Sequence, residues 1–569
     1  MNSGVNGEFK AWLARFFASY YRHRPVNATF IGEHDYDSLL PDFSAEGVAA
    51  AVWDAETLLR EAGQIDVDAL TPVERMDKRL AEGFLRIQQW EFGSDHFQRG
   101  NPALYTGEAI FGAIGLFLTD YAPFAERAQA ACARMHALEG LLAQGRENVR
   151  RAPAAWTQRA LRECAGAKAF FGAGIDTLAA GEPTGGTALK AELRRAADAA
   201  LEAFARHERY LADELSTAPI AAPPCGPEAL DLLLREGHCL RQTADEILSY
   251  ALQKMEEAEA YLVEHARDFG AADWREALGG LSAIHPTVEG YLGRYAELWE
   301  SSRELVRARD LVTWPDFPIE YVPQPRWARE AAPHLYFLFY RAPAAYNRPP
   351  VHRYLVTPIE PDMPPDEQVR RLQATNDSVI KLNHVVHHGG VGHHVQNYNA
   401  YHGASQIGRV AAVDCAARIA MFCGGTMAEG WACYATQLMA EQGFLTPLEE
   451  YGEAHADMRM AARAVVDVRL HRGEITVDEA AQFYASRTAM SSAAAQGEAV
   501  KNSMFPGAAL MYLMGRDTIL DLRADLKRRF GSSFSLREFH DRFLSFGSVP
   551  VALVAETMRR EAAAQPRVL

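Results

Sequence analysis

Residues 192–211, ELRRAADAALEAFARHERYL, place apolar side chains three or four positions apart in an otherwise charged segment. This spacing follows the 3.6-residue turn of an α-helix and puts the apolar side chains on one face. Alanine, leucine, glutamate and arginine, which favour helices, dominate most of the chain with the same spacing. Residues 1–25 show it as well. The sequence therefore predicts a mainly α protein that begins with an amphipathic helix.

One segment, residues 313–361, departs from this pattern because prolines and aromatic residues are frequent in it. Within it, residues 334–340 and 352–357 are short runs of the kind that form strands. The helical pattern returns at Met363 and continues to the end of the chain. We therefore expect a large helical body with a small β insert just before the histidine-rich residues 384–394.

Residues that break helices cluster at 181–187 (GEPTGGT) and more densely at 217–228 (TAPIAAPPCGPE). The second cluster is the better candidate for an internal boundary. A chain of 569 residues is also long for a single domain. We expect an N-terminal helical region, residues 1–216, and a C-terminal metal-site region, residues 217–569, which contains the small sheet at about 313–361.

Composition narrows the classes of function. Hydrophobic residues make up 48% of the chain, so it can bury a sizeable core. The formal net charge of −16 argues against binding nucleic acid or an anionic membrane. The N-terminus lacks the apolar core of a signal peptide, and no stretch approaches the ~20 apolar residues that span a bilayer. Seven cysteines without Cys-x-x-Cys spacing fit reduced thiols, so we expect a cytoplasmic protein.

Five of the 19 histidines lie within residues 384–394, which read HVVHHGGVGHH. Imidazole is the commonest protein metal ligand, so this density indicates a metal site. On an ideal helix His387 and His393 point to different sides, and one ion reaches both only if the helix is broken between them. The intervening glycines make such a distortion easy. We predict a helix, a glycine bulge and a second helix; the alternative is a glycine-rich turn with separately hydrogen-bonded histidines.

A metal needs a further ligand, and Glu429 is the best candidate because it is the one acid in an otherwise apolar helical run. A buried carboxylate is costly unless it has a partner. The partner is either the metal or an arginine, such as Arg409 or Arg418.

A second polar group lies on a later helix, where Arg463, Asp467 and His471 recur every four residues on one face. Ordinary ion pairing explains this spacing as well as a polar strip facing a cleft does. In the second case His471 or Arg463 would stabilise an oxyanion. Tyr512 is a weaker candidate for that role, and packing in the core is its default explanation.

These residues lie in motifs that resemble the bacterial DUF885 family, which is similar to helical zinc peptidases of the gluzincin type. The resemblance runs from residues 27–37 (NATFIGEHDYD) through 387–396, 429–432 and 463–471 to 506–515 and 539–541. It implies that His387, His393 and Glu429 hold a divalent metal, with His394 as the alternative to His393. Three ligands and an open position are typical of catalytic zinc; iron or manganese is the alternative metal.

His388 and Val391 depart from the family motif, His-Glu-x-x-Pro-Gly-His-His-Leu-Gln. The resemblance assigns the motif glutamate the role of general base on a metal-bound water. A neutral imidazole also accepts a proton, with a reference pKa near ~6.5, so His388 can replace the base. It can equally bind the metal as an extra ligand.

Three functions are consistent with these residues. The favoured one is a metal-dependent hydrolase of an amide or peptide-like bond, with His388 in place of the usual base. The second is a non-haem iron or manganese enzyme with redox or lyase chemistry, because two histidines and a carboxylate also bind Fe(II). The third is a non-catalytic binding protein on a peptidase-like scaffold. In each case the expected ligand is a small molecule or peptide-like, without nucleic-acid or membrane partners.

Overall fold

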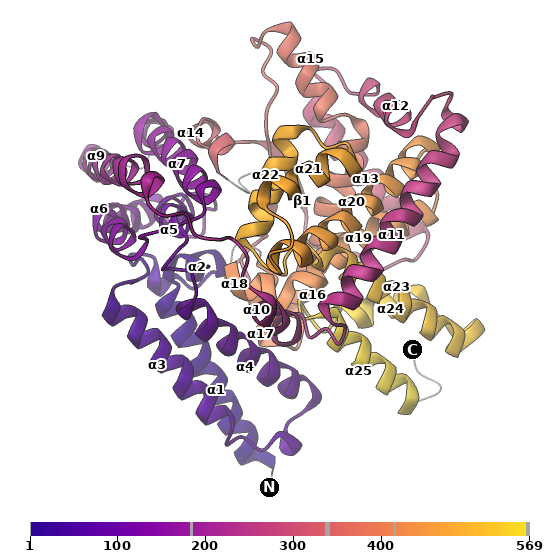
Figure 1. Cartoon of the computed structure of the whole chain (residues 1–569), viewed down its shortest axis with the longest axis horizontal. Coiled ribbons are helices and arrows are strands. Elements are labelled where there is room, and N and C mark those ends of the chain that lie inside the picture. The colour runs from indigo at the N-terminus through magenta and orange to yellow at the C-terminus, as the bar shows by residue number, and fades with distance from the viewer. Residues whose placement is uncertain (1, 183–185, 336–341, 414–416, 565–569) are drawn as a thin grey trace. The chain divides into compact units, whose positions relative to one another are not determined.

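The computed structural model describes residues 2–182, 186–335, 342–413 and 417–564. Most of them are helical, and the β structure of this described part is one two-stranded parallel sheet (Figure 1). The predicted fold class, mainly α with a small β insert before the histidine-rich segment, is confirmed.

Contacts between Cα atoms divide the chain into two compact units. Unit 1 comprises residues 1–225, 324–350 and 413–417, and unit 2 comprises residues 226–323, 351–412 and 418–569. Residues 324–350 and 413–417 therefore belong to the N-terminal unit, although they come late in the chain. The two predicted regions, in contrast, are each continuous in sequence. The division at residue 217 stays a prediction.

Unit 1 is made of helices, most of which bury one face, while the short helix Pro25–Ile31 is buried almost all round. These helices are α1 (Asn2–His23), α2 (Pro25–Ile31), α3 (Ala45–Ala62), α4 (Pro72–Gly93), α5 (Pro102–Ile114), α6 (Phe124–Asn148), α7 (Ala154–Ala169), α8 (Ile175–Gly181), α9 (Thr187–Arg209) and α14 (Arg326–Arg329).

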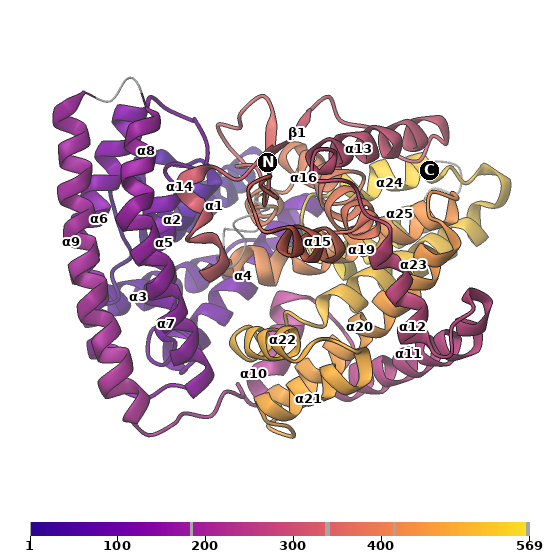
Figure 2. The same ribbon diagram turned by 90° about the horizontal axis from the view of Figure 1, so that it is seen from above.

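The two helical segments predicted from their spacing belong to this unit. Helix α1 buries Phe9, Trp12 and Phe16, as expected of an amphipathic N-terminal helix. The segment that begins at residue 192 forms most of α9, which buries Leu193 and Phe204 and packs against α6 and α7 (Figure 2). The period of apolar residues thus predicts both the helices and their buried faces.

Unit 2 contains the sheet and the histidine-rich segment. Apart from short 3-10 turns, its elements are α10 (Pro227–Leu232), a π-helix (Leu233–Gly237), α11 (Ala244–His265), α12 (Trp274–Gly279), α13 (Tyr291–Ala308), β1 (Ile319–Pro323), β2 (His352–Val356), α15 (Pro365–Ala374), a second π-helix (Val379–Gly389), α16 (His393–His402), α17 (Gln406–Ala411), a third π-helix (Ala420–Gly424), α19 (Gly425–Glu441), α20 (Pro447–His471), α21 (Val477–Thr488), α22 (Ser492–Met504), α23 (Met511–Phe530), α24 (Leu536–Leu544) and α25 (Val551–Ala564). Helix α18 (Ala417–Ile419) lies at the boundary between the units.

The small sheet pairs β1 with β2 in parallel, with Tyr321 opposite Tyr354. The strand predicted at 352–357 is confirmed by β2. The other predicted strand, residues 334–340, lies mostly outside the described residues; His334 itself ends a short 3-10 turn. Strand β1 was not singled out by the sequence pattern, because prolines surround it on both sides.

Helices α19 and α23 cross at two glycines, and this crossing fixes the neighbours of Glu429. A Cβ atom on Gly430 would lie 2.5 Å from the backbone of Gly515, and one on Gly515 would lie 2.2 Å from the carbonyl oxygen of Thr426. Only glycine allows so close an approach. The crossing brings the start of α23, with Tyr512, beside the α19 turn that carries Glu429.

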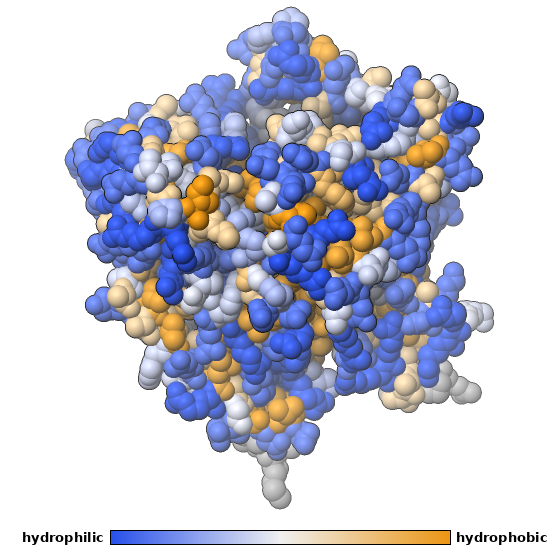
Figure 3. All heavy atoms as spheres, in the orientation of Figure 1, coloured by the Kyte–Doolittle hydropathy of each residue, from blue (hydrophilic) through white to orange (hydrophobic). Residues whose placement is uncertain are grey.

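No helix within the described residues is long and apolar enough to cross a membrane. On the face drawn in Figure 3, hydrophilic side chains predominate and hydrophobic ones form small separate patches.

Candidate metal centre

The helix that carries the first histidines is broken by glycines before the second pair. The π-helix ends at Gly389, residues 390–392 form a turn, and α16 begins at His393. A Cβ atom on Gly392 would lie 2.0 Å from the carbonyl oxygen of His387, so this turn needs glycine. The predicted order of helix, glycine bulge and helix is confirmed, although the first helix is wider than the α-helix assumed.

The indoles of two tryptophans hold the turn in place. Trp299 of α13 donates its Nε1–H to the Gly389 carbonyl oxygen at 2.7 Å, and Trp431 of α19 donates to the Val391 carbonyl oxygen at 2.8 Å. These carbonyl groups lose their helical partners at the break, so the indoles satisfy acceptors that would otherwise be left unpaired. The second bond also joins the turn to the helix that carries Glu429.

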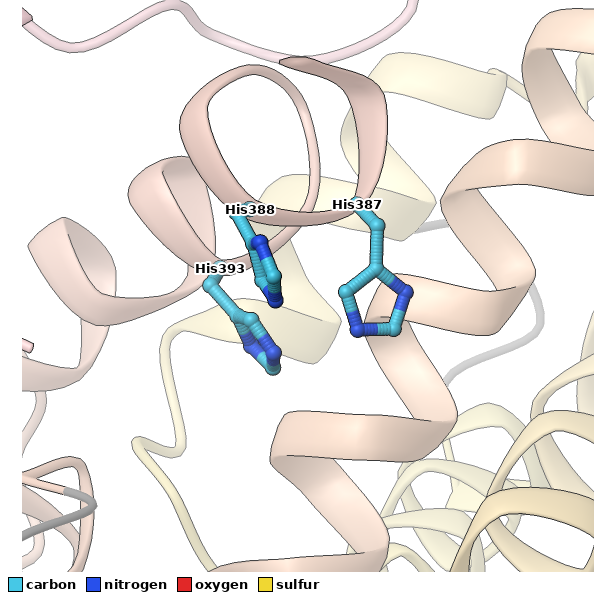
Figure 4. Close-up of side chains that lie close together, drawn as sticks. All are labelled: His387, His388 and His393. Atoms are coloured by element: carbon cyan, nitrogen blue, oxygen red, sulfur yellow. The ribbon is translucent and has the colours of Figure 1, made fainter. Parts of the chain in front are cut away.

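The break brings three imidazoles and one carboxylate together. One ring nitrogen from each of His387, His388 and His393 lies within 4.8 Å of the others, and the three rings point toward one another (Figure 4). Glu429 Oε2 lies 3.3 Å from His387 Nε2 and 3.8 Å from His393 Nε2. His387 and His393 thus belong to two overlapping triads, one completed by His388 and the other by Glu429.

The charge states of these groups suit a cation. Burial would raise the pKa of Glu429, but the facing His387 and His393 imidazoles lower it below its ordinary value. Burial lowers the pKa of His393 to about 4, despite the opposing charge of Glu429. Burial and the neighbouring imidazoles lower the pKa of His388 well below 6.5. At neutral pH Glu429 is therefore ionised and the His388 and His393 imidazoles are unprotonated, which are the forms that bind metals.

The residues present fit a bound metal ion. Among the described residues, the buried Glu429 Oε2 makes no hydrogen bond and has the two imidazole nitrogens as its polar neighbours. A buried carboxylate oxygen that accepts no hydrogen bond is costly. Zinc–ligand bonds of about 2.0–2.1 Å in a tetrahedron separate donor atoms by about 3.3 Å, close to the two distances around Glu429. The side chains of His387 and Glu429 are 16% and 21% exposed, so both are only partly buried.

Neither predicted arginine partner accounts for Glu429. Arg409 donates to the Gly403 carbonyl oxygen at 2.9 Å, and the Arg418 guanidinium lies over the Phe505 ring. The alternative, an arginine partner, therefore finds no support among the described residues, and Glu429 faces the histidines.

His394 is not brought into the cluster. Its Nε2 donates to the Phe317 carbonyl oxygen at 2.7 Å, and its ring stacks on the Phe317 ring with an interplanar angle of 7°. Consecutive helical residues point in directions about 100° apart, so only one of His393 and His394 can face Glu429. The structure places His393, and not His394, beside Glu429.

His471 is also not brought into the cluster. It is fully buried, and its Nε2 donates to the Asn502 carbonyl oxygen at 2.9 Å. One turn earlier, Asp467 accepts hydrogen bonds from the backbone N–H groups of Gly507, Ala509 and Leu510. These contacts hold the connection between α22 and α23, and the structure therefore places His471 at this connection and not among the clustered histidines.

Arg463 and Tyr512, in contrast, lie together near Glu429. The Arg463 guanidinium lies over the Tyr512 ring, 4.8 Å from its centre, and its Nε donates to Glu498 at 2.7 Å. Burial raises the pKa of Tyr512 well above 10, and the charge of Glu429 raises it further. Burial lowers the pKa of Lys501, which the charges of Glu498 and Glu429 oppose. This set, Arg463, Glu498, Lys501 and Tyr512, is the polar wall of the site.

Three residues at or beside the site were not predicted from the sequence: Glu498, Lys501 and Tyr354. Lys501 and Glu498 lie on α22, in an alanine-rich segment without a recognisable motif. Tyr354 of β2 lies 2.6 Å from His384 Nδ1 and 3.0 Å from His388 Nδ1 through its hydroxyl oxygen. Only its place at an inward position of a predicted strand, just before the histidines, could have suggested it.

The fold and the site define a mainly helical protein with a candidate metal centre at a glycine-broken helix. The chain belongs to the DUF885 family: residues 25–558 match the model described as "Bacterial protein of unknown function (DUF885)". None of the curated protein sequences matches the chain.

Two solved structures share the fold. One, from Shewanella oneidensis, is described as a "putative lipoprotein of unknown function"; it is 20% identical, with a TM-score of 0.78 over 97% of this chain and 99% of that one. The other, the "putative lipoprotein" from Colwellia psychrerythraea, is 18% identical, with a TM-score of 0.77 over 99% of this chain and 100% of that one.

Proposed function

We propose that this protein is a metal-dependent hydrolase of an amide or peptide-like bond, with the metal held by His387, His393 and Glu429. The observation that carries the proposal is the buried Glu429 Oε2, which makes no hydrogen bond to the described part of the chain and faces two imidazole nitrogens at 3.3 and 3.8 Å. The resemblance to helical zinc peptidases names the same three residues, and zinc is the metal expected first.

A divalent metal at this position would polarise a carbonyl group and lower the pKa of a coordinated water. The chain's own residues would supply the rest. Glu429 contributes negative charge that favours a cation. Tyr512 is a candidate hydroxyl donor, because burial and the charge of Glu429 raise its pKa and keep its hydroxyl protonated. Arg463, which lies over the Tyr512 ring, adds positive charge beside a developing oxyanion.

A second function, a non-haem iron or manganese enzyme with redox or lyase chemistry, is favoured by a different observation. His388 adds a third imidazole, with a ring nitrogen within 4.8 Å of those of the other two. The site thus has one nitrogen donor more than a peptidase site with two histidine ligands. Fe(II) and Mn(II) accept such mixed nitrogen and oxygen donors.

The cytoplasmic location also stays a prediction. The described free cysteines, Cys132, Cys164, Cys225, Cys239, Cys423 and Cys433, support a reducing compartment. The two similar structures are described as lipoproteins, so cell fractionation with an antibody against the full chain is the appropriate test.

Chelator-sensitive hydrolysis tests the proposal. The full chain, loaded in separate samples with one equivalent of Zn(II), Co(II) or Mn(II), is incubated with a broad panel of peptides and amides, with and without a chelator. We expect cleavage that the chelator and Glu429→Gln abolish and that His402→Ala, an exposed histidine on α16, retains. Metal-loaded protein that cleaves nothing on the panel would contradict hydrolysis. Oxygen consumption by the iron-loaded protein would then support the second function.

A further inference from the structure

His388 occupies the position where the resemblance expects a general base, but its surroundings are those of a metal ligand. Its ring is nearly parallel to that of His393, with the ring centres 5.6 Å apart, and lies 5.0 Å from the His387 ring. All three rings turn toward the same space in Figure 4. His388 is therefore as well placed as a third imidazole donor as it is to act as a base.

A hydrogen-bonded chain sets the tautomer of His388. The Tyr354 hydroxyl lies between two imidazole nitrogens, 2.6 Å from His384 Nδ1 and 3.0 Å from His388 Nδ1. A phenol carries one proton at neutral pH, so it donates to one nitrogen and accepts from the other. The shorter contact suits O–H donation to His384, and the longer one suits N–H donation from His388.

This chain leaves His388 ready to bind a cation. With its proton on Nδ1 and that proton held by Tyr354, the lone pair of the neutral ring is on Nε2. A ligating histidine almost always donates its other ring N–H to such a partner, which fixes both the tautomer and the orientation of the ring. Tyr354 lies on β2 and is 1% exposed, so its hydroxyl is a rigid partner.

We propose that His388 is a fourth protein ligand of the metal and that Tyr354 orients it. The inference rests on the metal centre proposed above and deepens it, because it changes the class of ion that the site prefers. Four protein ligands close a tetrahedral zinc site. A six-coordinate ion such as Fe(II), Mn(II) or Co(II) would keep two positions for water and substrate. Three imidazoles and one carboxylate therefore favour a six-coordinate ion for a catalytic role.

Cobalt binding tests this inference without any substrate. The metal-free full chain is titrated with Co(II), and both the affinity and the visible absorption, which reports the number and type of ligands, are recorded. We expect His388→Gln to lower the affinity at least ~100-fold and to change the spectrum. Tyr354→Phe should lower the affinity about 10–100-fold, the range expected for loss of an orienting partner.

Tyr295→Phe is the matched control, because Tyr295 is a buried tyrosine that packs on the His384 ring. It should bind Co(II) as the wild type does. If His388→Gln fails to fold, Tyr354→Phe keeps every ring at the site and carries the test alone.

The two proposals fail in distinguishable ways. Wild-type affinity and spectrum in His388→Gln or Tyr354→Phe, together with loss of binding in His387→Ala, would overturn the role of His388 and leave the metal centre standing. A wild-type chain that binds no Co(II), Zn(II), Fe(II) or Mn(II) would overturn both.

Discussion

The Trp431 indole donates a hydrogen bond of 2.8 Å to the Val391 carbonyl oxygen, and this bond joins the helix of Glu429 to the break between His387 and His393. Glu429 and Trp431 are two residues apart on α19. One turn of this helix therefore supplies both the carboxylate that faces the histidines and the indole that supports the glycine-rich break at residues 390–392. Gly430, between them, permits the crossing with α23. Each residue of this short motif thus has a separate structural task.

Replacing Trp431 with phenylalanine removes the donor but keeps an aromatic ring. The buried Val391 carbonyl group then lacks a partner, and we expect the free energy of unfolding to fall by about 1–3 kcal/mol. The metal affinity should fall about tenfold, because the two histidines are no longer held at one spacing. Trp274→Phe is the control: Trp274 is also buried but packs against His455. Equal metal affinity in both variants would show that Trp431 does not position the site.

Gly392→Ala should disrupt the break itself. The added Cβ atom would lie 2.0 Å from the His387 carbonyl oxygen, a backbone atom that cannot move aside without moving His387. We expect a loss of roughly 2–4 kcal/mol in unfolding free energy, measured with urea, together with weaker metal binding. Gly497→Ala is the matched control in α22, where a Cβ atom meets nothing within 4 Å and should stabilise the helix by up to ~1 kcal/mol.

Metal content tests the proposed ligands individually. We expect one equivalent of metal in the full chain as purified, measured by mass spectrometry, and its loss in His387→Ala, His393→Ala and Glu429→Ala. His402→Ala, on the same helix as His393, should keep the metal. If His393→Ala keeps its metal, a residue other than His393 must be the ligand. Circular dichroism establishes that each variant is folded.

The sequence predicted much of this site because the constraint on it is local. Two histidines six residues apart cannot reach one ion from an unbroken helix, and the glycines between them mark where the break lies. The period of apolar residues likewise predicted α1 and α9. These inferences need only the geometry of one chain segment.

The remaining features depend on distant contacts that no local pattern encodes. The choice between His393 and His394 is made by the Phe317 carbonyl group, 77 residues away from His394. The sequence places Arg463 and His471 on one helix face. In the structure His471 donates to the Asn502 carbonyl oxygen near the end of α22, whereas the Arg463 guanidinium packs over the Tyr512 ring. The sequence shows which side chains are on one face, and tertiary packing determines what each of them meets.

Acid should destabilise the protein because histidines that are buried in the neutral form become protonated on unfolding. His540 allows the contribution of one such histidine to be measured. Its Nδ1 donates to the Leu311 carbonyl oxygen, and its Nε2 accepts from the Tyr434 hydroxyl. Burial lowers the pKa of His540 to about 3, so between pH 6.5 and 4 the unfolded state binds the proton and the folded state does not. Stability is therefore lost as the pH falls, by roughly 3 kcal/mol from this group.

The measurement is urea unfolding of metal-free wild type and His540→Gln between pH 7.5 and 4. Glutamine cannot become charged, so the variant should be less stable at pH 7.5 but should lose less stability on acidification. Burial raises the pKa of Glu453 and Asp467 to about 7, and these groups act in the opposite direction in both proteins. Their contributions cancel in the difference. Parallel pH profiles would contradict the assignment to His540.

Tyr512→Phe separates chemistry from metal binding. The phenol ring packs under the Arg463 guanidinium, and phenylalanine preserves that contact while removing the hydroxyl group. If the hydroxyl stabilises an oxyanion beside the metal, kcat/KM on a substrate that the wild type cleaves should fall about 100-fold with the metal content unchanged. Tyr484→Phe is the control, because the Tyr484 hydroxyl is hydrogen-bonded to Asn502. Loss of metal in Tyr512→Phe would indicate a structural role for Tyr512. Full activity of this variant would remove Tyr512 from the mechanism. Arg463 and Lys501 of the polar wall would then be the candidates for stabilising the oxyanion.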